Sequence, residues 1–174
     1  MNRHQLATLL SWSGEQGFSG RKRLQKVVFF LQQAGCDLQC HYTLHFFGPY
    51  SRDVADTCDE MVAAGLVEET GGPKKGSMQY AYKLKPEILK LVNEAPELQV
   101  QQFCDLGKRL IGADIWQLEL GSTILFFHRQ SSDWESALKE ACTFKKVAPD
   151  AAESRTSLDL AKSFTLPPPV NQPK

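Results

Sequence analysis

The sequence has no long hydrophobic stretch, because its longest run of aliphatic and aromatic residues covers only residues 27–31. A helix that crosses a bilayer needs about 20 such residues. Residues 1–10 carry Arg3 and His4 and show no apolar core followed by a small-residue cleavage site, so no secretory signal is expected. The five cysteines follow no disulfide-framework spacing, which fits reduced thiols. We therefore expect a cytoplasmic protein without a membrane segment.

Patterns that mark common enzymes are also missing. The chain contains no Walker, Rossmann, HExxH or GxSxG pattern. We therefore expect no enzyme, no catalytic residues and no cofactor. What is present is a chain of 174 residues with 42% hydrophobic and 23% charged residues, which is typical of a folded globular protein.

The charges cancel in number, with 20 basic against 20 acidic residues, but they are segregated along the chain. Residues 1–35 are mainly basic, residues 36–70 mainly acidic, residues 71–93 basic again, and residues 94–174 mixed. This balance argues against a uniformly basic nucleic-acid binder. The simplest interpretation is that each block forms the solvated face of one element.

The first half of the chain predicts helices and short strands in alternation. A short helix ends near Ser13, and a better one covers residues 20–33 and is closed by Gly35. Alternating apolar residues predict a strand over residues 41–47. The break that follows contains the residues of a turn and of a helix cap, and we expect a structural role for each of them: Gly48, Pro49, Tyr50 and Ser51.

Ser51 begins a helix that ends at Gly65, and a hairpin comes next. Its strands are expected over residues 66–69 and 80–84, around a glycine-rich loop over residues 70–77. The order helix, helix, strand, helix, hairpin is that of a winged helix-turn-helix.

The second half is expected to be helical, and the predicted fold class is therefore α+β, mainly α with a small β-hairpin. A winged helix-turn-helix core covers residues 1–92, and a C-terminal helical extension over residues 93–164 packs on it as one unit. A proline-rich, flexible tail covers residues 165–174. Apolar spacing places helices over residues 86–92, 98–111, 114–128, 133–142 and 151–163, of which 114–128 is apolar nearly all round and should be buried.

Three stretches carry a resemblance to a known family. They are residues 20–31 with the Leu24-Gln25-Lys26 triplet, residues 46–51 with the Gly-Pro-Tyr-Ser turn, and residues 66–69; residues 116–120 and 133–135 look like the helical half of the same group. The chain resembles the YwgA-like proteins and the related Panacea (SocA-like) domain. The resemblance implies a winged-helix core with a helical extension, in families of antitoxins and proteolytic adaptors without known catalytic residues.

Basic residues of the second helix and of the hairpin loop are candidates for contact with a partner or with phosphates. The helix that would read DNA argues against sequence-specific reading, because carboxylates outnumber its basic residue. The candidate contact residues are Arg21, Lys22, Arg23, Lys26, Arg52, Lys74 and Lys75.

A metal site is not expected. Cys36, Cys40 and His41 are the nearest soft ligands, but no second pair of ligands matches them. His41 and His45 would lie about 13 Å apart on a strand and could not share one ion. The cysteines fit better as small buried hydrophobes or loop thiols, and the roles of Cys36 and Cys40 stay open.

Glu119 stands in the middle of the apolar helix over residues 114–128, with no lysine or arginine three or four positions away. A buried carboxylate needs a cation, and the basic segment from Arg21 to Lys26 is the expected source. The alternative is that Glu119 points to solvent through a gap in the apolar face.

Two functions remain open. The first is a non-enzymatic, cytoplasmic winged-helix interaction module, antitoxin- or adaptor-like, that binds a protein partner. The alternative is a winged-helix nucleic-acid-binding regulatory protein that contacts phosphates through the basic helix and the wing. Homodimerisation stays open in both.

Overall fold

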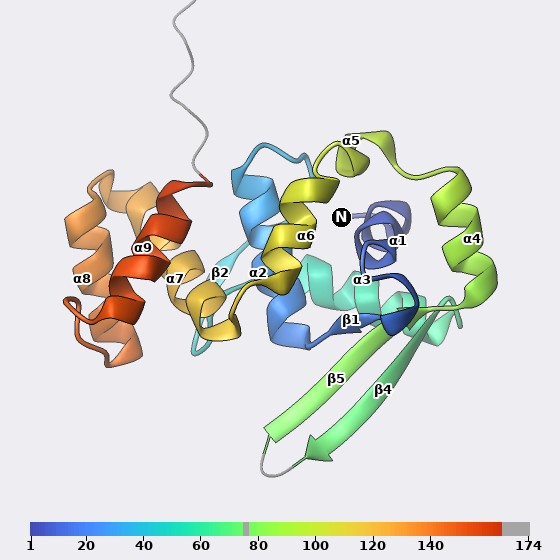
Figure 1. The fold of residues 1–174 in the computed structure, drawn as a ribbon, viewed down its shortest axis with the longest axis horizontal. Coiled ribbons are helices and arrows are strands. Elements are labelled where there is room, and N and C mark those ends of the chain that lie inside the picture. Colours follow the sequence, from blue (N-terminus) through green and yellow to red (C-terminus); the bar gives the residue numbers. More distant parts are fainter. Residues whose placement is uncertain (75–76, 165–174) are drawn as a thin grey trace, which may run out of the picture.

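The computed structural model describes residues 1–74 and 77–164, which are mostly helical with two small antiparallel sheets (Figure 1). The elements are α1 (Arg3–Ser11), a 3-10 turn (Gly14–Gln16), β1 (Phe18–Ser19), α2 (Arg21–Gln33), β2 (Thr43–His45), β3 (Gly48–Tyr50), α3 (Arg52–Ala63), β4 (Val67–Lys74), β5 (Ser77–Leu84), α4 (Pro86–Glu94), α5 (Leu98–Gln101), α6 (Cys104–Gly112), α7 (Ile115–Ser131), α8 (Trp134–Lys145) and α9 (Ala152–Lys162). The expected tail over residues 165–174 lies outside the described residues.

Helix α2 lies at the centre of the first half and is buried along most of its length. Gly35 follows the helix in the left-handed region, at φ 101°, and donates its N–H to the carbonyl of Gln32. The next N–H, of Cys36, reaches back to the carbonyl of Leu31, which completes a Schellman-type end. The prediction that Gly35 closes this helix is confirmed.

The larger sheet has the strand order β1-β5-β4. Strands β4 and β5 pair along their whole length, from Val67 opposite Leu84 to Lys74 opposite Ser77, and form the long arm in Figure 1. The prediction of a loop over residues 70–77 is therefore wrong at both ends, because residues 70–74 belong to β4 and residue 77 belongs to β5. Strand pairing is made by the backbone and needs no side chains, so the glycines at 71 and 72 do not prevent it.

The smaller sheet is a hairpin of β2 and β3, and it corrects two predictions. The strand expected over residues 41–47 ends at His45, and residues 48–50 form the returning strand, with His45 opposite Gly48. The turn therefore falls on Phe46 and Phe47, two bulky residues without turn chemistry. Gly48, the first residue of the returning strand, adopts the left-handed conformation that favours glycine, at φ 90°.

The C-terminal helices cluster around α7, which packs against α2, β3, α8 and α9. The single helix expected over residues 98–111 is wrong, because it is broken into α5 and α6 at Gln102 and Phe103. One apolar core runs through the molecule, and its buried side chains include Phe18 and Leu24 from the first half and Leu118 and Leu158 from the second. The division at residue 92 stays a prediction.

Among the described helices, none is both long and apolar enough to span a membrane by itself. Helices α6 and α7 taken together have the length and composition of a membrane span, but their axes meet at an angle of 119°.

Candidate interaction surface

The basic residues of α2 are tied to other parts of the protein. The guanidinium of Arg21 donates to the Glu69 carboxylate at 2.6 Å and lies over the Tyr80 ring. Arg23 donates to two backbone carbonyl oxygens at the end of α6, those of Ile111 (2.9 Å) and Ala113 (2.5 Å). These contacts join α2 to the hairpin arm on one side and to the C-terminal helices on the other.

Glu119 on α7 is buried, with a side chain that is 6% exposed, and an ammonium group contacts each of its two carboxylate oxygens. Lys22 Nζ lies 2.6 Å from Oε1, and Lys145 Nζ of α8 lies 3.4 Å from Oε2. The expected ion pair with the Arg21 to Lys26 segment is confirmed, with Lys22 as the partner. Lys145 was not anticipated, because no local spacing links α8 to Glu119.

Lys26 lies beside this ion pair and is 2% exposed. Its Nζ donates to the carbonyl oxygen of Pro49 at 2.6 Å. Burial lowers the pKa of Lys26 to about 7, and the charges of Lys145 and Lys22 act in the same direction, against that of Glu119. Burial likewise lowers the pKa of Lys145. We refer to Lys22, Lys26, Lys145 and Glu119 as the lysine cluster.

The lysine cluster holds the β2–β3 hairpin against α7. Lys26 binds the Pro49 carbonyl, and Lys145 Nζ donates to the carbonyl of Phe46 at 3.2 Å. Gly48 passes so close to α7 that a Cβ atom there would lie 2.5 Å from the Thr123 hydroxyl oxygen. The hairpin tip therefore has a fixed position on the second half of the chain.

Ser51 lies at the N-cap of α3 as predicted, but its expected capping hydrogen bond is absent. Its hydroxyl lies 3.4 Å from the Asp53 carboxylate instead. The side-chain amide of Gln25 bonds both backbone polar groups of Ser51: it accepts from the N–H at 2.8 Å and donates to the carbonyl at 2.9 Å. The carbonyl also accepts from the Ala55 N–H at 3.4 Å. The ring of Tyr50 packs on His45, with centroids 4.6 Å apart. This turn is thus held by α2 and by ring packing.

Three phenylalanines are exposed around the lysine cluster, and we refer to Phe46, Phe47 and Phe144 as the aromatic patch. Phe46 is 81% exposed, Phe47 49% and Phe144 37%. The rings of Phe46 and Phe47 lie 5.1 Å apart, and Lys22 Nζ lies 4.6 Å from the centre of the Phe47 ring. Lys145, which binds the Phe46 carbonyl, lies 5.8 Å from the Phe144 ring. The hairpin tip and the end of α8 therefore meet at one surface.

Helix α3 presents acidic side chains to solvent. Arg52 is paired with Asp56 of the same helix at 3.4 Å, and Glu60 binds Arg3 of α1 at 3.1 Å. Lys74 ends β4, paired with Ser77, whereas its side chain and the whole of Lys75 fall outside the described part of the chain. The candidate contact residues whose side chains the structure describes, Arg21, Lys22, Arg23, Lys26 and Arg52, are therefore paired or buried and do not form one free basic surface.

The cysteines and histidines do not converge. Cys36 and Cys40 are buried, and burial raises the pKa of the Cys36 thiol to about 12. His41 pairs with Asp53, whose pKa is lowered chiefly by the hydrogen bond from the His41 backbone N–H. Within residues 1–74 and 77–164, no group of three or more histidine, cysteine or acidic side chains could hold a metal ion.

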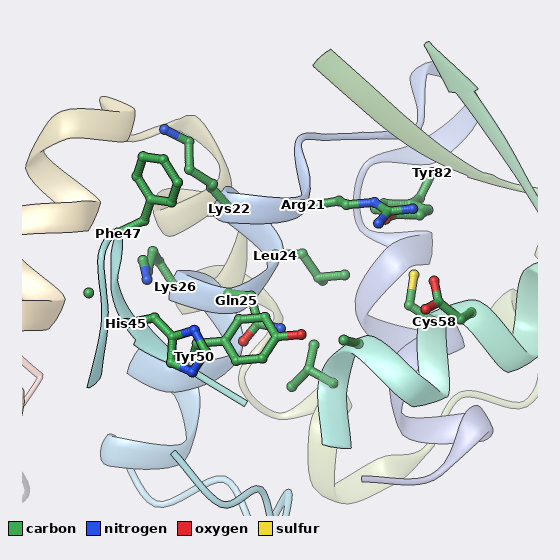
Figure 2. Close-up of a pocket in the computed structure, with 14 residues that line it drawn as sticks. Arg21, Lys22, Leu24, Gln25, Lys26, His45, Phe47, Tyr50, Cys58 and Tyr82 are labelled. Carbon is green, nitrogen blue, oxygen red and sulfur yellow. The ribbon is translucent and has the colours of Figure 1, made fainter. Parts of the chain in front are cut away.

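A cavity of about 270 Å³ opens between α2, the β2–β3 hairpin, α3 and β5 (Figure 2). Lys22, Lys26, His45 and Phe47 gather at one end, and Arg21, Cys58 and Tyr82 lie at the other. Burial raises the pKa of the Cys58 thiol to about 12, so the thiol stays protonated near neutral pH.

The fold and this surface define a mostly helical α+β protein in which a short hairpin, docked on the central helix of the second half, presents exposed aromatic side chains. No protein-family model matches the chain. The uncharacterised protein YwgA of Bacillus subtilis (strain 168) is 30% identical over 122 residues, which cover 70% of this chain and 72% of YwgA. The chain therefore belongs to the YwgA family.

Proposed function

We propose that this protein is a non-enzymatic, cytoplasmic interaction module that binds a protein partner through the aromatic patch. The observation that carries the proposal is the exposure of Phe46 at the tip of a hairpin whose backbone is fixed by Lys26 and Lys145. Exposed aromatic side chains on a rigid support are typical of the residues that dominate protein interfaces. A rigid support also reduces the entropy lost on binding.

We further propose that the first half of the chain is a winged helix-turn-helix core. The order α1-β1-α2-α3-β4-β5 and the sheet order β1-β5-β4 support it, since the hairpin then lies next to the helix that would read DNA. The β2–β3 hairpin is an insertion between α2 and α3 in this scheme. An antitoxin- or adaptor-like role follows from the Panacea resemblance in the sequence and stands as part of the proposal.

Nucleic-acid binding is the weaker alternative, because the basic residues of α2 already have partners. Arg21, Lys22 and Arg23 are bonded to a carboxylate or to backbone carbonyls, and Lys26 is buried. The outer face of α3 carries carboxylates that would repel a phosphate backbone. Arg52 is exposed, but it is paired with Asp56.

The proposal is tested with the full chain as bait in an extract of its host cell. A captured protein is purified, and its affinity is measured by calorimetry for the wild type, Phe46→Ser and Leu98→Ser. Leu98 is the matched control, because it is 78% exposed but lies on α5. We expect Phe46→Ser to weaken binding by about tenfold or more.

Leu98→Ser should bind as the wild type does, and both variants should keep the wild-type melting temperature, since neither side chain is buried. Light scattering shows whether the partner is a second copy of the chain. Equal binding by Phe46→Ser and the wild type would contradict the proposal. So would duplex binding by the wild type with an affinity that falls steeply as salt rises.

A further inference from the structure

The cavity of about 270 Å³ has two chemically different ends. Lys22 and Lys26 lie beside Phe47 at one end, and Cys58 and Tyr82 lie at the other with Arg21, whose guanidinium is bonded to Glu69 (Figure 2). Leu24 lies between the two ends, and Val54 is a further apolar residue of the lining. A ligand that fills such a cavity needs an anionic group at one end and an apolar group at the other.

Most of the charged groups around the cavity are paired. Arg21 is bonded to Glu69, and Lys22 is bonded to Glu119, which also contacts Lys145. Among the described residues, Lys26 is the lysine of the lining whose ammonium group contacts a backbone carbonyl rather than a carboxylate. A carboxylate on a ligand would provide it with a negative partner.

Lys26 is the cation with unused bonding capacity. A lysine ammonium has three N–H donors, and within the described residues Lys26 makes one hydrogen bond, to the Pro49 carbonyl. Lys26 is only 2% exposed in total, so it has little contact with water that could use these donors. A carboxylate that enters from the cavity would accept one of the remaining N–H donors.

A duplex backbone does not fit this site, because Lys26 is buried and its Nζ points from α2 toward the hairpin, where it binds the Pro49 carbonyl (Figure 2). A slender carboxylate would approach it through the cavity, which Lys26 lines. The apolar end favours a carboxylate that carries an aliphatic or aromatic group over an inorganic anion.

We propose that this cavity binds a carboxylate attached to an apolar group, with the carboxylate at Lys22 and Lys26 and the apolar group against Leu24, Val54 and Tyr82. Two sources share this chemistry: a free monocarboxylic acid, and the C-terminal residue of a protein chain whose last side chain is apolar. Of the aromatic patch, Phe47 lines the cavity but Phe46 and Phe144 do not, so a change at Phe46 separates this proposal from the proposed function.

A carboxylate beside Lys26 favours its charged form, so binding takes up a proton when the free amine is neutral. The charged and titratable groups that face Lys26 or line the same cavity are Lys22 and Arg21 on α2, His45 on β2, Asp59 on α3, Glu119 on α7 and Lys145 on α8. Since the pKa of Lys26 is about 7 without ligand, affinity should fall as pH rises from 6.5 to 8.5. The expected fall is about tenfold.

The test uses calorimetry and NMR titration of the full chain with four probes. They are 4-methylpentanoate, its neutral amide 4-methylpentanamide, a peptide that ends in leucine with a free carboxylate, and the same peptide with a C-terminal amide. We expect at least one of the two acids to bind about tenfold more tightly than its amide at pH 6.5. The small acid and the peptide distinguish the two sources.

Two variants locate the site. Lys26→Met should remove both the preference for the acid and the pH dependence. Ala55→Phe, which fills the cavity and leaves Lys26 in place, should abolish binding and provides the test if Lys26→Met does not fold. Phe46→Ser should bind the probes as the wild type does, which separates this proposal from the one above.

The proposal is overturned if neither acid binds at a ligand concentration of about 10 mM, which is on the order of the Kd of the weakest complex expected from a few contacts. It is also overturned if acid and amide bind equally, or if a folded Ala55→Phe binds as tightly as the wild type.

Discussion

Replacing Glu119 by alanine is expected to lower the free energy of unfolding by about 3 kcal/mol, because removing one partner of a buried ion pair leaves the other charge uncompensated. The charge left without its partner is that of Lys145, whose side chain is 6% exposed, and Lys26 is buried beside it. For a chain of this size, 3 kcal/mol corresponds to a fall in melting temperature of roughly 6–12 °C.

Double-mutant cycles separate the contribution of each lysine to the free energy of unfolding, which is measured by urea unfolding monitored with circular dichroism. Glu119 and Lys145 should couple by about 1–3 kcal/mol, as buried contacting residues do. Glu119 and Lys22 should couple by less than about 1 kcal/mol, because the Lys22 side chain is 48% exposed.

The exposed pair Arg3–Glu60 is the matched control, with an expected coupling of at most about 0.5 kcal/mol. A cost of less than about 1 kcal/mol for Glu119→Ala would show that the buried carboxylate does not compensate the lysine charges. A coupling of Glu119 to Lys145 no larger than that of the control pair would show the same.

Three further predictions concern the hairpin and α2. Gly48→Ala should destabilise the protein by more than about 2 kcal/mol in thermal melts, because the residue has φ 90° and its Cβ would lie 2.5 Å from a hydroxyl oxygen on α7. Gly72→Ala is the control and should have little effect in thermal melts, because open space surrounds Gly72. Gln25→Leu should cost about 2 kcal/mol, because it leaves the buried N–H of Ser51 without its hydrogen-bond acceptor. Ser51→Ala should stay within about 0.5 kcal/mol, since no cap is lost. The pKa of Lys26 in the folded state, about 7, lies below that of a free lysine, so the unfolded state binds more protons than the folded state above pH 7. The free energy of unfolding should therefore rise between pH 7 and 8.5. At higher pH, ionisation of the thiols in the unfolded state opposes this rise, because burial raises the pKa of Cys58 in the folded state. Urea titrations of wild type and Lys26→Met across this range should show the rise in the wild type alone, and an equal rise in both would exclude Lys26 as its cause.

Much of the helical framework was predictable from local patterns. Helix α2 and its end at Gly35, the start of α3 at Ser51, and the caps of α7 and α8 at Asp114 and Asp133 all follow from apolar spacing and capping residues. The ion pair of Glu119 with the basic segment was also predictable, because a carboxylate in an apolar helix without a local cation needs a distant one.

The rest depends on contacts between distant segments. The turn at Phe46 and Phe47 carries no local signal, because it is held by Lys26 and by Lys145, about a hundred residues further along the chain. The same holds for the support of Ser51 by Gln25 and for the second cation on Glu119. The sequence predicts a loop for the glycine-rich segment after Glu69, because the pairing of this segment is made by the backbone and leaves no alternating side-chain pattern.

Partner binding at the aromatic patch is tested most directly by hydrogen exchange of the full chain alone and in complex with the protein it captures. We expect protection on complex formation in residues 43–50 and in the last turn of α8, which carries Phe144 and Lys145. Protection confined to α3 and the β4–β5 arm, with exchange at residues 43–50 unchanged, would contradict it.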